Sequence, residues 1–156
     1  MTWTQRLLQQ RLSGGAAWIP TVVRLAAGVV LVAVSLSKFT RHADLVAAFE
    51  RYGIPLPELS VYLAGTVELV GGLLLVLGLL TRPAALVVAA QMVVAVGTGG
   101  RIDRDFFHLW LGLILLAAAL FLAWSGSGRL GVDERLARDT TTPRSPVRRA
   151  PASAGG

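Results

Sequence analysis

Long, almost uncharged apolar runs dominate this sequence and restrict what it can fold into. Between Tyr52 and Gly100 only three side chains are charged, those of Glu58, Glu68 and Arg82. Charged residues make up 15% of the chain, whereas they make up about 25% of an ordinary soluble domain. A water-soluble fold of this length cannot bury so many consecutive apolar side chains. The sequence therefore predicts an integral membrane protein.

Four apolar runs, 19–39, 59–80, 83–97 and 106–124, are expected to be membrane-spanning helices. A helix needs about 20 residues to cross a hydrocarbon core of about 30 Å, and only the third run is clearly shorter. A cleaved signal peptide is disfavoured for the first run, because its apolar core would span only about 7–15 residues. The predicted fold class is all-α, an integral membrane four-helix bundle over residues 19–124.

The polar connection between the first two runs is expected to hold a short interfacial helix. Leu45, Phe49 and Tyr52 recur at helical spacing and would form its apolar face. The Gly-Ile-Pro-Leu-Pro segment 53–57 would end it. A tight turn is expected at residues 81–83.

Basic residues gather at the two ends of the chain. The N-terminal segment 1–18 is basic, and the basic tail 125–156 has little to bury and is expected to be largely disordered. Four spans would place ten Lys and Arg residues on the side of the termini and five on the other side. Because the cytoplasmic side normally carries the excess, both termini are predicted to be cytoplasmic.

The composition excludes several kinds of site. The chain has no cysteine, which excludes disulfides, iron–sulfur clusters and cysteine-ligated zinc. Of its two histidines, His42 lies outside the apolar runs, so a pair of axial haem ligands within the membrane is implausible, and no metal site is expected. The net charge of +6 sits mostly at the chain ends, which argues against nucleic-acid binding.

Five polar side chains interrupt the apolar runs, namely Arg24, Lys38, Glu68, Gln91 and His108. An ionisable residue in the bilayer is costly, on the order of 2.5–3.5 kcal/mol on insertion scales, and usually faces the interior of a bundle. Each of the five shares a helix face with small residues, which let helices approach closely in lipid. We therefore expect these polar groups to point toward one another.

Glu68, in the middle of its run, is expected to be the centre of this polar group. Lys38 and His108 would approach it from one side, and Arg24 and Gln91 from the other. Simpler interpretations stay open: Arg24 and Lys38 as anchors that reach headgroups, His108 bonded to a backbone carbonyl, and Gln91 as a contact between helices. Glu68 itself could belong to a structural ion pair.

Several short motifs, in order and spacing, resemble the DoxX family of small four-helix bacterial membrane proteins. They are Arg-Leu-Ala-Ala-Gly at 24–28, Ser-Lys-Phe at 37–39, Gly-Ile-Pro at 53–55, Glu-Leu-Val-Gly-Gly at 68–72, Leu-Gly-Leu-Leu-Thr-Arg at 77–82 and Gly-Ser-Gly-Arg-Leu-Gly-Val-Asp at 126–133. The family often has His followed by Asn at the start of its last helix, whereas His108 here is followed by Leu109. A carry-over of a site to this position is therefore in doubt.

The resemblance implies a bacterial cytoplasmic-membrane subunit linked to redox or sulfur chemistry. A related small protein serves in thiosulfate oxidation coupled to quinone, and other relatives are described as membrane anchors for oxidative-stress partners. On this basis we expect a redox partner protein and no covalently bound cofactor. A quinone is the candidate ligand, with Lys38, Glu68, Gln91, His108 and Arg24 as its binding residues.

In this interpretation Glu68 and His108 would also relay protons, and a partner protein would supply the electrons. Whether the chain is itself an enzyme stays open, as does homo-oligomer formation. The alternative is a non-enzymatic scaffold that recruits partners through segment 42–52 or the basic tail. Transport is the weaker alternative, because the sequence has no visible inverted repeat or broken helix pair.

Overall fold

The computed structural model describes residue 12 and residues 14–102 and 106–134, and that part of the chain is helical with no strand. The elements are η1 (Gly14–Ala17), α2 (Trp18–Thr40), α3 (His42–Arg51), α4 (Pro57–Leu77), α5 (Thr81–Gly97), α6 (Gly99–Ile102) and α7 (Phe106–Ser125). The predicted all-α class is confirmed. Most of the N-terminal segment (residues 1–11 and 13), residues 103–105 and the tail beyond residue 134 lie outside the described residues.

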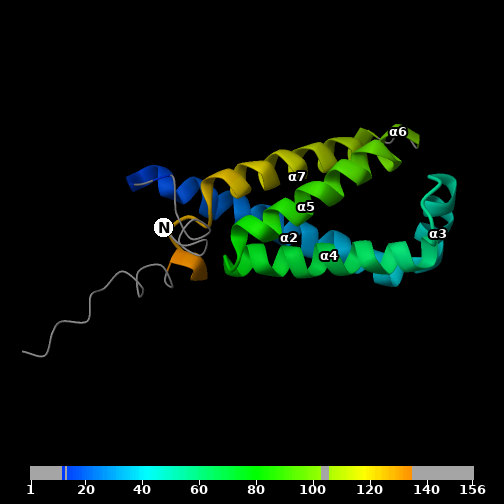
Figure 1. The fold of residues 1–156 in the computed structure, drawn as a ribbon, viewed down its shortest axis with the longest axis horizontal. Coiled ribbons are helices and arrows are strands. Elements are labelled where there is room, and N and C mark those ends of the chain that lie inside the picture. Colours follow the sequence, from blue (N-terminus) through cyan, green and yellow to red (C-terminus); the bar gives the residue numbers. More distant parts are fainter. Residues whose placement is uncertain (1–11, 13, 103–105, 135–156) are drawn as a thin grey trace, which may run out of the picture.

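The four long helices form two packed pairs, with α2 mainly on α4 and α5 mainly on α7. The pairs lie close together at the end where the described chain begins and finishes, and they diverge toward α3 (Figure 1). Gly28 and Gly72 allow α2 and α4 to approach closely, because a Cβ at Gly28 would lie only 2.8 Å from the carbonyl oxygen of Gly72. Small residues at this crossing are what helix packing in lipid requires.

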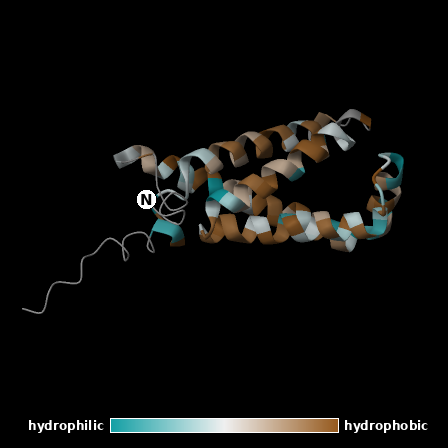
Figure 2. Cartoon of the chain, in the orientation of Figure 1, coloured by the Kyte–Doolittle hydropathy of each residue, from teal (hydrophilic) through white to brown (hydrophobic). Residues whose placement is uncertain are grey.

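The four long helices are hydrophobic along most of their length (Figure 2). Val22, Leu86 and Ile114, on three different helices, are each more than half exposed. Apolar exposure on this scale is typical of a surface that contacts lipid. Three helical stretches, Gly14–Thr40, Pro57–Leu77 and His108–Ser125, are long and apolar enough to cross a membrane. The 17-residue α5 is apolar but shorter, so its crossing stays a prediction.

The turn between α4 and α5 comes earlier than residues 81–83, where the sequence predicts it. Gly78 and Leu80 both have a positive φ, 67° and 48°, and Thr81 already begins α5. Pro83 therefore lies in the first helical turn, where no backbone N–H is needed for an intrahelical bond. This is why a proline that looks like a turn residue is compatible with the helix.

Residues 126–134, called the closing segment from here on, fold back across the end of the bundle. Although composition places them in the tail with little to bury, Ser127 and Asp133 are 3% and 4% exposed. The Asp133 carboxylate accepts hydrogen bonds from the backbone N–H groups of Leu80 and Thr81, at 2.8 and 2.9 Å. The closing segment thus caps the start of α5.

Helix α3 lies across the opposite end of the bundle, where the two helix pairs diverge (Figure 1). It is joined to α2 through Arg41 and to α4 through a bend in which Gly53 and Leu56 have positive φ values of 71° and 50°. The predicted short helix between the first two long helices is therefore present. Its position at the membrane surface stays a prediction.

Candidate functional site

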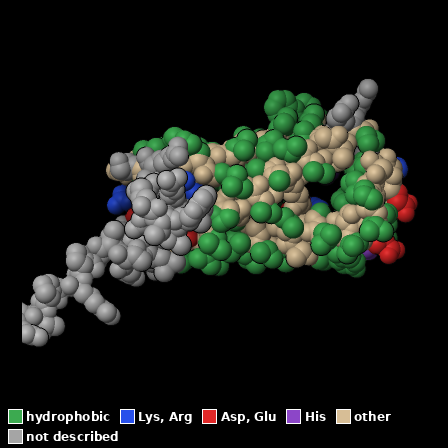
Figure 3. All heavy atoms as spheres, in the orientation of Figure 1, with side chains coloured by type: hydrophobic (Ala, Val, Ile, Leu, Met, Phe, Trp, Pro, Cys, Tyr) green, Lys and Arg blue, Asp and Glu red, His purple; other side chains and the backbone are tan. Residues whose placement is uncertain are grey.

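A cavity of about 850 Å³ lies between the two helix pairs on the side of α3. Side chains of α2, α3, α4, α5 and α7 line it, and most of them are apolar. The space-filling view shows the molecule hollowed between the helix pairs near α3 (Figure 3). An apolar cavity between bundle helices, with a few polar groups, is the usual form of a small-molecule site.

The strongest polar contact in the cavity joins α2 to α4. Lys38 Nζ lies 2.6 Å from Glu68 Oε2, and the two side chains are 13% and 6% exposed. A buried charge pair of this kind is weakly screened, and removing one partner would leave the other charge uncompensated. The sequence prediction that Lys38 approaches Glu68 is met by this geometry.

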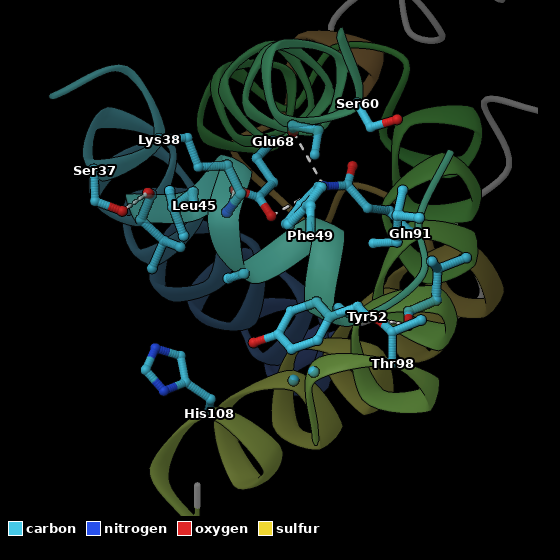
Figure 4. Close-up of a pocket in the computed structure, with 18 of the residues that line it drawn as sticks. Ser37, Lys38, Leu45, Phe49, Tyr52, Ser60, Glu68, Gln91, Thr98 and His108 are labelled. Carbon is cyan, nitrogen blue, oxygen red and sulfur yellow. Dashed lines mark hydrogen bonds and ion pairs between the residues drawn. The ribbon is translucent and has the colours of Figure 1, made fainter. Parts of the chain in front are cut away.

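Gln91 on α5 completes the arrangement around Glu68. Its Nε2 donates hydrogen bonds to Glu68 Oε1 at 3.0 Å and to the Ala64 carbonyl at 3.1 Å. Because a carboxylate only accepts hydrogen bonds, Gln91 must turn its NH₂ group toward it. Lys38, Glu68 and Gln91, called the polar cluster below, therefore hold both carboxylate oxygens in fixed directions (Figure 4).

A glycine on α4 explains why Lys38 can reach Glu68. A Cβ at Gly65 would lie 3.2 Å from Lys38 Cβ and 3.2 Å from the Phe39 ring. An added Cβ would therefore require Lys38 or Phe39 to shift by a few tenths of an ångström, just where the ion pair forms. The glycine one turn before Glu68 thus allows α2 to lie close to α4 at the ion pair.

His108 lines the same cavity from α7. Figure 4 places it on the wall across from the polar cluster, beyond Tyr52. The structure therefore places His108 in the wall of the same cavity as Glu68. It lies on the opposite wall, however, and not on the side from which Lys38 approaches. A ligand between His108 and Glu68 would face both residues.

Arg24 does not join the polar cluster, contrary to the expected arrangement. It is 2% exposed and lies at the other end of the bundle. Its Nε donates to the Ser127 carbonyl at 2.9 Å, and its Nη1 donates to the carbonyls of Leu75 and Val76 at 2.8 and 2.6 Å. The last carbonyls of a helix lack intrahelical partners, so Arg24 ties α2 to the end of α4 and to the closing segment.

The inner face of α3 is the part of the cavity that sequence reasoning missed. Leu45, Phe49 and Tyr52 all line the cavity, although their spacing by itself predicts only an apolar face on the membrane. The helical spacing was the available signal, but it could not tell a lipid surface from a cavity. Within the described ranges, no group of three or more His, Cys, Asp or Glu side chains is arranged to hold a metal ion.

The comparisons with known proteins agree on one family. The family model for DoxX matches residues 19–101. The chain is 36% identical over 135 residues to "Uncharacterized membrane protein Rv3486" of Mycobacterium tuberculosis, a match that covers 76% of this chain and 82% of that protein.

Two more distant relatives cover a similar share of the chain. "Inner membrane protein YphA" of Escherichia coli is 25% identical, over 73% of this chain and 87% of that protein. "Putative oxidoreductase CatD" of Bacillus subtilis is 28% identical, over 72% of this chain and 82% of that protein. The comparison with solved structures found no match.

Proposed function

The chain belongs to the DoxX family of membrane proteins, and from this premise we propose that it is an accessory subunit of a membrane redox system. In this proposal the cavity beside the polar cluster takes the headgroup of a quinone. The observation that carries it is the buried contact of Lys38, Glu68 and Gln91 in the wall of a cavity whose lining is largely apolar. The name of the Bacillus subtilis relative points in the same chemical direction.

The residues of the cavity fit such a ligand. A volume of about 850 Å³ falls within the range of small-molecule sites, roughly 300–1,000 Å³. Lys38 Nζ has three N–H donors, and among the described residues it bonds Glu68, so further donors remain for a ligand carbonyl oxygen. The apolar walls suit a ring and the first part of an isoprenoid tail.

The protein residues have separate parts in this proposal. When bound, the quinone supplies a two-electron acceptor, and a partner protein supplies the electrons because the chain has no cysteine and no plausible haem ligation. Lys38 holds a ligand oxygen, while Glu68 and His108 stand on opposite walls as groups that can exchange protons with it. Gln91 keeps the Glu68 carboxylate in place.

Binding of a short-tailed quinone tests this proposal. The protein in lipid nanodiscs is titrated with decylubiquinone, and Glu68→Gln is compared with Glu58→Gln, an exposed glutamate of the same helix. We expect Glu68→Gln to weaken binding by about tenfold or more, the effect of about one charge-assisted hydrogen bond, and Glu58→Gln to leave it unchanged. Absence of binding to the unaltered protein, or equal affinities of the two variants, would contradict the proposal.

A scaffold function is the second candidate, and the charge distribution favours it. Residues 14–134 contain eight basic and eight acidic residues, so the whole net charge of +6 belongs to segments 1–13 and 135–156. Such flanks can attract an acidic partner. In that case, deletion of residues 139–156 would abolish partner recruitment, while Glu68→Gln would leave recruitment intact at equal protein levels.

A further inference from the structure

Helix α3 is fixed at its beginning by an aromatic contact. The rings of His42 and Tyr62 are stacked with centroids 4.1 Å apart and planes 25° apart, which attaches the start of α3 to α4. Its exposed side carries charged residues, among them Asp44, Glu50 and Arg51. Asp44 and Arg51 also line the cavity, together with Leu45, Phe49 and Tyr52.

The far end of α3 reaches the other helix pair through Tyr52. A Cβ at Gly99, the first residue of α6, would lie 3.3 Å from Tyr52 Cε2 and 3.4 Å from its hydroxyl oxygen. The ring therefore lies close against the Gly99 backbone, and a Cβ there would require the ring to shift by a few tenths of an ångström. Tyr52, Gly99 and the neighbouring Thr98 all line the cavity, so this contact forms part of the cavity wall.

We propose that Tyr52, seated on Gly99, closes the cavity at its α3 end and thereby determines which ligands reach the polar cluster. The exposed, charged residues of α3 suit the aqueous side, and Asp44 and Arg51 among them line this end of the cavity, while the hollow between the helix pairs in Figure 3 opens among apolar side chains. With Tyr52 in place, water-soluble molecules that reach the charged end of the cavity are kept from the polar cluster, and ligands arrive from the bilayer. Tyr52 is thus a specificity-determining residue for lipid-soluble ligands, and the identity of that ligand as a quinone rests on the proposed function.

The absence of cysteine makes this proposal directly testable. Ala64→Cys places a single thiol in the cavity wall beside Gln91. Its rate of modification in nanodiscs is measured with fluorescein maleimide, which is charged and stays in water, and with N-ethylmaleimide, which enters lipid. In this background we expect Tyr52→Ala to raise the fluorescein maleimide rate by about tenfold, because the open fraction multiplies the rate, and to leave the N-ethylmaleimide rate within about twofold.

Gly99→Val disturbs the same contact from the side of α6, because its added side chain would displace the Tyr52 ring. It should therefore also raise the fluorescein maleimide rate. The matched control is Trp110→Ala, which removes an exposed aromatic side chain of α7 outside the cavity lining and should change neither rate. A fluorescein maleimide rate that is equally low or equally high with and without Tyr52 would overturn the proposal. Thiol titration of the denatured variants confirms that the cysteine is present.

The outcome separates this proposal from the proposed function. If Tyr52→Ala admits fluorescein maleimide while decylubiquinone does not bind the unaltered protein, the closure stands and the quinone assignment fails. If decylubiquinone binds and depends on Glu68 while the thiol is indifferent to Tyr52, the closure fails and the quinone assignment stands.

Discussion

Glu68 shows how one buried carboxylate can organise a membrane protein interior. Its two oxygens are bonded to Lys38 from α2 and to Gln91 from α5, so a single side chain connects three helices. In hydrocarbon such a group needs partners, because an unpaired charge there is costly. The polar cluster is thus a contact that fixes the packing, and under the proposed function it is also the ligand site.

Removing the lysine should be worse than removing both charges. Lys38→Met leaves Glu68 buried without its cation, and we expect the free energy of unfolding in bicelles to fall by about 3–5 kcal/mol. The double variant Lys38→Met with Glu68→Leu should recover most of that loss. If the single and the double variant are equally stable, the ion pair does not contribute to packing in the way described here.

Arg24 is expected to affect stability and not ligand binding. Arg24→Lys loses the planar donor set that reaches three carbonyls, and hydrogen bonds from a charged group are worth roughly 1.5–3 kcal/mol each. We therefore expect a lower unfolding temperature and an unchanged affinity for decylubiquinone per folded molecule. A selective loss of affinity would place Arg24 in the binding site after all.

At the scale of elements, the closing segment sets where α5 begins. The Asp133 carboxylate takes the N–H groups of Leu80 and Thr81, and the Gly78 carbonyl accepts a hydrogen bond from the Asp133 N–H at 3.0 Å. A carboxylate at a helix N-terminus also interacts favourably with the helix dipole. The capping residue thus comes from 52 positions further along the chain.

Asp133→Ala tests this long-range cap. We expect a loss of about 0.5–2 kcal/mol, the usual effect of removing a helix cap, together with faster hydrogen exchange at the amides of Leu80 and Thr81. Glu134→Ala, one residue further on, is the control and should leave those two amides protected. Unchanged exchange in Asp133→Ala would show that the first turn of α5 is held by other contacts.

The elements and the site were predictable to different degrees. Apolar runs located the long helices, because lipid requires each spanning segment to be apolar and internally hydrogen bonded. Helical spacing brought Lys38 and Gln91 to Glu68. Helical spacing could not place Arg24. It shows how deep the residue lies along its helix, but not that the free carbonyls at the end of α4 bind the guanidinium. The cap by Asp133 depends on a fold-back that no local pattern encodes.

At the scale of the whole molecule, the charge is divided between a neutral bundle and basic ends. Residues 14–134 carry no net charge, so the excess of +6 lies in the two terminal segments. The described chain begins and finishes at the same end of the bundle (Figure 1). The positive-inside rule therefore predicts that this end faces the cytoplasm and that α3 faces the opposite side.

Fusion reporters can check this orientation. Green fluorescent protein fused after residue 156 should fluoresce, because it folds on the cytoplasmic side, and alkaline phosphatase fused at the same position should be inactive. Alkaline phosphatase inserted after Arg51, in the connection between α3 and α4, should be active. The reverse pattern would mean that the terminal charges do not determine the topology.

The central claim, that a base and an acid meet inside the bundle, can be measured directly because Lys38 is the only lysine in the chain. Protein labelled with ¹⁵Nζ-lysine and ¹³Cδ-glutamate is placed in lipid, and the nitrogen–carbon dipolar coupling is recorded by solid-state NMR. We predict a strong coupling that corresponds to a separation below about 4 Å, as in a charge-assisted hydrogen bond, and its loss in Glu68→Gln. The absence of this coupling in the unaltered protein would contradict the account.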